Sequence, residues 1–120
     1  MRYYWHLTIL AMCAGITACS AFYTEIEDYP CPPGGTTLTY DNFGAGFMNA
    51  HCQWCHGSEA NDRQGAPGEF IFDTQAQVIR HKARIFVRSA AENDSMPPGP
   101  EDPSLDERTK LAEWLACGAP

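Results

Sequence analysis

The amino-acid sequence predicts a small all-α domain with three main helices. Three stretches of the chain repeat apolar residues at spacings of three and four, as a helix with one buried face does. Two of these stretches follow a capping box, in which a serine or threonine pairs with a Glu or Gln three positions later. The chain has 120 residues, a length that suits one domain.

The first helix is expected to begin near Asp41, which can act as its N-cap. After Asp41, apolar or small residues recur at helical spacing in two rows. These rows are Phe43, Phe47 and Ala50, and Gly44 with Met48.

The middle helix should follow a capping box of Thr74 and Gln77, and the last helix a capping box of Ser104 and Glu107. Gly118 fits the left-handed position just past the last helix. The face of the middle helix that should cover the core or a bound cofactor consists of Ile79, Ala83, Phe86 and Ala90, flanked by Val78 and Ile85. The last helix should bury Leu111, Trp114 and Leu115.

The composition limits the classes of protein to which the chain can belong. It has 15 acidic and 8 basic residues and a net charge of −7, which gives no basic surface for the phosphates of nucleic acid. Its 44% apolar content is too high for a wholly disordered chain. We therefore expect a folded domain with no nucleic-acid partner.

The first residues of the chain have the layout of an export signal. Residues 1–18 contain a short start with one arginine, an apolar run too short to span a bilayer, and small residues before Cys19. The segment 16–19 resembles the lipobox of bacterial lipoproteins, which implies cleavage before Cys19 and acylation of its thiol. A plain secretory signal cut nearby is the alternative. Residues 19–37, rich in Pro and Gly, should form a flexible tether, and residues 38–120 the folded domain.

Two cysteines, Cys31 and Cys117, lie near opposite ends of this domain. In an oxidising compartment they are expected to form a disulfide. The chain-entropy model gives such a bridge a stabilisation of roughly 4 kcal/mol. Two separate thiols are the alternative.

Residues Cys52 to His56 have the spacing C-x-x-C-H, which is the attachment signature for c-type haem. On one turn of helix, Cys52 and Cys55 can bond to the two vinyl groups of a porphyrin, and His56 can then ligate the iron. A zinc site would need a second pair of ligands at short spacing. A thioredoxin-like dithiol would need a preceding strand, where the sequence indicates a helix.

With this motif the chain resembles a class I cytochrome c domain over about residues 38–117. The resemblance implies one covalent haem, axial ligation by His and Met, and a last helix that crosses the first. Gly44 matches a glycine of that crossing, whereas Met48 stands where the family usually has an aromatic residue. Trp114 is expected to pack against this region. The resemblance also implies that the Pro67 carbonyl, in the loop 57–68, accepts a hydrogen bond from the His56 imidazole.

Met96 is the expected second axial ligand. It stands in a Met-Pro-Pro-Gly loop after the middle helix, and two prolines stiffen that loop. Met48 is too close to the haem motif to reach the opposite face of a porphyrin. The competing ligands are His81 and His51, and an open coordination site or an ordinary surface methionine are further alternatives.

A basic row runs along the middle helix through Arg80, Arg84 and Arg88, with Lys82 nearby. It can dock an acidic partner, pair with haem propionates, or form a solvated helix face.

The sequence thus favours an exported, lipid-anchored electron carrier with one haem, since the chain has no second haem motif. It would act on the periplasmic side of a membrane, with the outer membrane favoured, and exchange electrons with redox partner proteins rather than catalyse a reaction itself. A haem-based sensor or redox-enzyme subunit with an exchangeable sixth ligand is one alternative. A surface lipoprotein without haem, stapled by Cys31 and Cys117, is the other.

Overall fold

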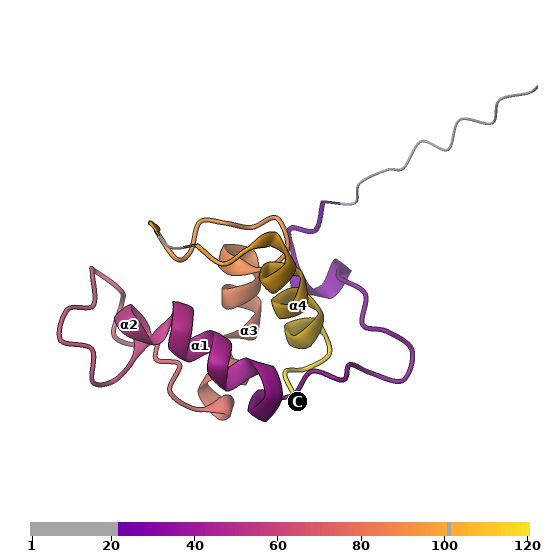
Figure 1. Ribbon diagram of the computed structural model, residues 1–120, viewed down its shortest axis with the longest axis horizontal. Coiled ribbons are helices and arrows are strands. Elements are labelled where there is room, and N and C mark those ends of the chain that lie inside the picture. Colours follow the sequence, from indigo (N-terminus) through magenta and orange to yellow (C-terminus); the bar gives the residue numbers. More distant parts are fainter. Residues whose placement is uncertain (1–21, 101) are drawn as a thin grey trace, which may run out of the picture.

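The computed structural model describes residues 22–100 and 102–120, and this part of the chain is helical without a strand (Figure 1). Two short turns, η1 and η2, accompany four α-helices. The elements are η1 (Ile26–Asp28), η2 (Tyr40–Gly44), α1 (Ala45–His51), α2 (Gln53–His56), α3 (Gln75–Ser89) and α4 (Leu105–Ala116). The expected signal peptide and the lipid site Cys19 lie outside the described residues. Among those residues, no helix is long and apolar enough to cross a membrane.

The first helix begins two residues earlier than expected, and Asp41 is not its N-cap. Thr39 caps the π-helical turn η2: its side chain accepts from the N–H of Asn42 at 3.1 Å, and the Asn42 side chain accepts from the N–H of Thr39 at 2.7 Å. Thr39 has extended backbone angles suited to a cap. Asp41 lies inside the first turn.

Both predicted capping boxes are confirmed. Thr74 and Gln77 start α3, and Ser104 and Glu107 start α4. Gly118 has φ +99°, as expected past the end of α4. The predicted apolar face of α4 is fully buried.

The predicted face of α3 is only partly correct. The buried residues of this helix are Val78, Ile85, Phe86 and Ser89. Ile79 is 41% exposed and Ala83 is also exposed. The buried row begins one residue earlier than the sequence suggested, because the packing of α3 against α4 and η1 sets its rotation.

The expected close approach of the first and last helices is confirmed. A Cβ atom on Gly44 would overlap the indole ring of Trp114. Both residues are buried, and Met48, one turn beyond Gly44, is fully buried in the same core. A residue without a side chain therefore allows the start of α1 to lie directly on α4.

The expected flexible tether over residues 19–37 is wrong for residues 26–31. Ile26 is 6% exposed and belongs to the core, and the Tyr29 ring packs edge-on against Phe86 at 5.7 Å between centroids. The predicted disulfide is present: Cys31 and Cys117 are bonded, with their Cα atoms 5.1 Å apart. Burial of these apolar side chains and the disulfide hold the segment on α3 and α4.

Candidate functional site

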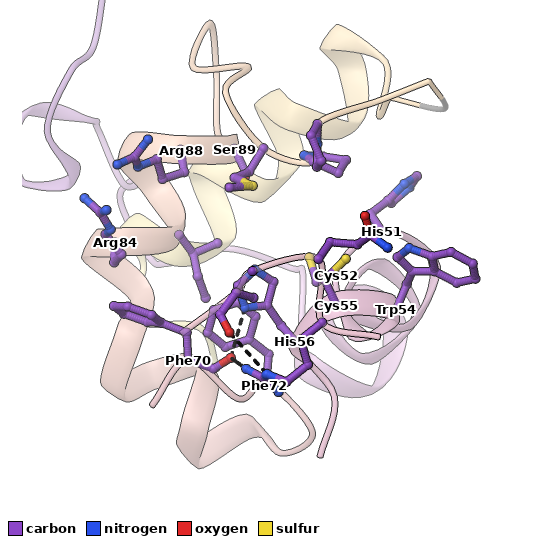
Figure 2. A pocket seen from close by; sticks show the side chains of 18 of the residues that line it. His51, Cys52, Trp54, Cys55, His56, Phe70, Phe72, Arg84, Arg88 and Ser89 are labelled. Atoms are coloured by element: carbon purple, nitrogen blue, oxygen red, sulfur yellow. Dashed lines mark hydrogen bonds between the residues drawn. The ribbon is translucent and has the colours of Figure 1, made fainter. Parts of the chain in front are cut away.

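One cavity of about 750 Å³ gathers most of the predicted site residues (Figure 2). Cys52, Cys55, His56 and Met96 all line it, although α3 separates Met96 from the other three in the sequence. Its volume lies in the range of small-molecule and cofactor sites. The cavity is therefore the candidate site.

The two cysteines lie where α1 gives way to α2. Cys52 leaves helical geometry with φ −120°, and Cys55 lies on the single turn α2 that follows. Both are free thiols and are partly buried. In Figure 2 they lie next to each other, so one ligand can reach both sulfurs.

The surroundings of both thiols disfavour their ionised form. Burial raises the pKa of Cys52 to about 12, against a smaller opposing effect of the Arg108 charge. Burial, followed by the Asp62 charge, raises the pKa of Cys55, and Arg63 opposes this. A dithiol catalyst needs a lowered cysteine pKa. The raised pKa values of Cys52 and Cys55 therefore do not favour a thioredoxin-like site.

The imidazole of His56 is oriented by a backbone carbonyl. Its Nδ1 lies 2.9 Å from the Phe70 carbonyl oxygen, and since that oxygen can only accept, Nδ1 carries the proton. Nε2 then keeps its lone pair for a metal ion. The ring also stacks on Phe72 at 4.7 Å between centroids, which fixes its plane.

The expected role of Pro67 is not what the structure shows. Its carbonyl accepts from the Phe70 N–H at 3.1 Å and from the Arg63 Nη2 at 2.9 Å. The first of these bonds closes the turn from Pro67 to Phe70. The carbonyl three residues later is therefore the one that reaches His56.

Arg63 is a site residue that the sequence analysis missed. Its guanidinium donates to four backbone carbonyls of one loop, which are those of Gly57, Ala66, Pro67 and Phe70, at 2.9–3.3 Å. The Phe70 oxygen thus accepts from both Arg63 and His56. Arg63 fixes the acceptor that orients the imidazole.

Met96 lines the cavity from the loop between α3 and α4. Its N–H donates to the Arg88 carbonyl at 2.8 Å, and its own carbonyl accepts from Arg108 Nη1 at 2.8 Å. Met96 as a whole residue is 37% exposed. The backbone is thus held at both sides while the thioether is left free.

The competing ligands are placed differently. His51 also lines the cavity, but its Nε2 lies 3.6 Å from a Glu107 carboxylate oxygen. His81 does not line the cavity, and it packs on Phe70 at 5.1 Å between ring centroids. Among the residues the structure describes, no three His, Cys, Asp or Glu side chains form a group that could hold a metal ion.

The cavity wall is basic within an acidic protein. Arg63, Arg84 and Arg88 line it, and no Asp or Glu does. Figure 2 shows Arg84 and Arg88 at the end away from Cys52 and Cys55. Within the described ranges neither forms an ion pair.

Comparison of the chain with protein-family models, with curated proteins and with solved structures finds no match.

Proposed function

We propose that this chain is a mono-haem c-type cytochrome that carries single electrons outside the cytoplasm. The observation that carries the proposal is the shared cavity of Cys52, Cys55, His56 and Met96. Two thiols, an imidazole with a free Nε2 and a thioether are the groups that covalent haem with His/Met ligation requires.

The residues present fit such a cofactor in size, chemistry and charge. The cavity of about 750 Å³ suits a large planar ligand. Cys52 and Cys55 would hold the porphyrin covalently, and His56 and Met96 would ligate its iron. The carboxylates of a porphyrin would meet a wall with three arginines and no acidic residue. Bound haem supplies one-electron chemistry between ferrous and ferric iron.

The protein would contribute orientation, exclusion of water and partner choice. Phe70 fixes the tautomer of His56 through Nδ1. Ligation by a methionine thioether favours a higher reduction potential than two imidazoles give. The net charge of −7 would steer the carrier toward redox partner proteins with basic surfaces.

We also propose that the chain is exported and anchored to a membrane. The leader 1–18 would direct the chain out of the cytoplasm, and a lipid on Cys19 would hold it at the periplasmic side of a membrane, with the outer membrane favoured. Covalent haem attachment takes place in that compartment, as does formation of a disulfide such as Cys31–Cys117.

The decisive experiment is the mass and the pyridine haemochrome spectrum of the full chain, exported from a host that matures c-type haem. We expect a c-type spectrum and a mass that includes one porphyrin. The control is the double variant Cys52→Ser/Cys55→Ser, which keeps His56 and Met96 and should carry no covalent haem. A colourless wild-type protein whose two thiols can be alkylated contradicts the proposal and favours the lipoprotein without haem.

Ligation by Met96 is tested separately. Met96→Ala should abolish the weak near-infrared band of methionine bound to ferric iron and lower the reduction potential. Met48→Leu is the matched control, because Met48 is buried outside the cavity lining. If both properties survive in Met96→Ala, Met96 is not a ligand.

A haem-based sensor is the second candidate, because Met96 is 37% exposed and an exposed thioether can be displaced. A sensor would bind carbon monoxide readily in the wild-type protein. An electron carrier with six-coordinate iron should resist it.

A further inference from the structure

Arg108, on the first turn of α4, is a buried cation without a buried counter-ion. It is 4% exposed and forms no ion pair within the part of the chain that the structure describes. Its Nη2 is buried and has no hydrogen-bond partner there. Burial of an uncompensated guanidinium is costly. Only the hydrogen bonds of its other two nitrogens offset this cost.

Those hydrogen bonds all go to one segment of backbone. Nη1 donates to the carbonyls of Ser89, Asn93 and Met96 at 2.9, 3.1 and 2.8 Å. Nε donates to the Pro103 carbonyl at 3.2 Å. These four carbonyls lie at the end of α3, in the loop, at Met96 and just before α4. One side chain therefore ties together the whole connection that presents Met96.

The contact at Met96 is the one that bears on the cavity. The Met96 N–H is held by the Arg88 carbonyl, so the Arg108 bond fixes the second side of the same residue. Without Arg108, the carbonyl side of Met96 loses its only hydrogen bond among the described residues. The thioether could then swing farther from the cavity.

We propose that Arg108 is a positioning residue that sets where the Met96 sulfur lies in the cavity and so keeps the sixth iron position closed. The proposal rests on the proposed function, because it concerns the loop of the expected second ligand. In this role Arg108 acts through the hydrogen bonds of its guanidinium to the loop backbone, and not through its charge alone.

The test compares Arg108→Lys, Arg108→Met and Lys110→Met in the exported holoprotein. Arg108→Lys keeps the charge and the aliphatic stem but loses the planar fork of donors. Lys110→Met is the matched control, because it removes a charge from an exposed position of the same helix, where Lys110 pairs with Asp106. The measurements are the near-infrared band, the rate of cyanide binding to the ferric protein and the amide exchange of residues 90–104.

We expect both Arg108 variants to weaken the band and to bind cyanide about tenfold faster or more, the shift that loss of one hydrogen bond to a charged group produces. Exchange of the Met96 amide should speed up, while the amides of α1 keep their protection. Lys110→Met should match the wild type. If Arg108→Met does not fold, Arg108→Lys alone decides the outcome.

Two failures are distinguishable. If the wild type carries haem but the band and the cyanide rate are unchanged in Arg108→Lys, the positioning role is wrong and the proposed function stands. If the wild type is colourless, the proposed function fails, and the role of Arg108 as a ligand-positioning residue fails with it, whatever amide exchange shows.

Discussion

The two walls of the cavity are each organised by an arginine that donates to backbone carbonyls. On the His56 side, Arg63 reaches four carbonyls that lie within seven residues of itself. On the Met96 side, Arg108 reaches carbonyls up to 19 residues away. Arg63 is partly exposed, whereas Arg108 is buried.

The difference shows that the two walls depend on different parts of the fold. The His56 wall is a local loop that Arg63 closes on itself. The Met96 wall depends on the packing of α4 against α3 (Figure 1). Arg108 on α4 donates to the Ser89 carbonyl at the end of α3 and to the Met96 carbonyl. Changes to α4 should therefore disturb Met96 before they disturb His56.

Removal of the disulfide is expected to have the largest effect. Cys31→Ser/Cys117→Ser opens a link between residues 86 positions apart, and the free energy of unfolding should fall by roughly 4 kcal/mol. Urea unfolding followed by circular dichroism measures this loss, and reduction of the disulfide in the wild-type protein should reproduce it. Amides of the Met96 loop should lose protection before those of residues 57–70. Equal loss of protection in both loops would contradict the inference that the two walls depend on different parts of the fold.

A substitution that disturbs the contact between Gly44 and Trp114 should destabilise both walls of the cavity. Gly44→Ala places a methyl group on the indole ring, and the free energy of unfolding should fall by about 1–3 kcal/mol. Gly46→Ala on the same helix is the control: nothing lies within 4 Å of its added Cβ, and it should stabilise the helix by about 0.5–1 kcal/mol. Thermal unfolding of the two variants tests this opposite response.

Arg63→Gln should open only the His56 wall. It removes donors from the loop of residues 57–70, at an expected cost of about 1–2 kcal/mol in local stability. Hydrogen exchange at Ala66 and Phe70 should accelerate. If the chain carries haem as proposed, the near-infrared band of Met96 should stay. Arg80→Gln, an exposed arginine outside the cavity lining, provides the control. Loss of the Met96 band in Arg63→Gln would show that the two walls are coupled.

Removal of the N-terminal cap of α4 should have the smallest effect on the free energy of unfolding. Ser104→Ala is expected to cost about 1 kcal/mol at neutral pH, as Thr74→Ala should at α3. The Ser104 N–H, followed by its hydroxyl, holds the pKa of Glu107 below its ordinary value of 4.5. Because the pKa of Glu107 is lowered in the folded state, Glu107 stabilises the fold above pH 4.5. This stabilisation is lost as the pH falls through the folded-state pKa of Glu107. Urea titrations should therefore show a smaller Ser104→Ala deficit in acid, and an unchanged deficit would argue against the Glu107 contribution.

The sequence predicted those features that depend on side chains close together in the chain or on scarce residue types. The capping boxes at Thr74 and Ser104 are local patterns. The disulfide followed from the two cysteines left over after the others were assigned. Trp114 and Gly44 could be matched only because the resemblance to a known family named their crossing.

The missed features act through the backbone or through long-range packing. Phe70 orients His56 with its carbonyl, and any residue carries a carbonyl, so the side chain gave no signal. Arg63 and Arg108 likewise recognise carbonyls whose positions depend on the folded loops. Thr39 forms its capping box with Asn42 instead of the usual Glu or Gln. Burial was predicted wrongly for Ile79 because the rotation of α3 is set by the helices packed against it.

If Cys19 is lipidated as proposed, the docking of residues 23–31 on the helices would limit how far the domain can travel from the membrane. Tyr23 already packs edge-on against Tyr29 at 4.8 Å between ring centroids. If Cys19 carries the lipid, the stretch from it to Tyr23 spans no more than about 14 Å even when fully extended. If the chain also carries haem as proposed, it would stay beside the lipid headgroups and pass its electron to a neighbour in the same layer, instead of ferrying it across a wide aqueous gap.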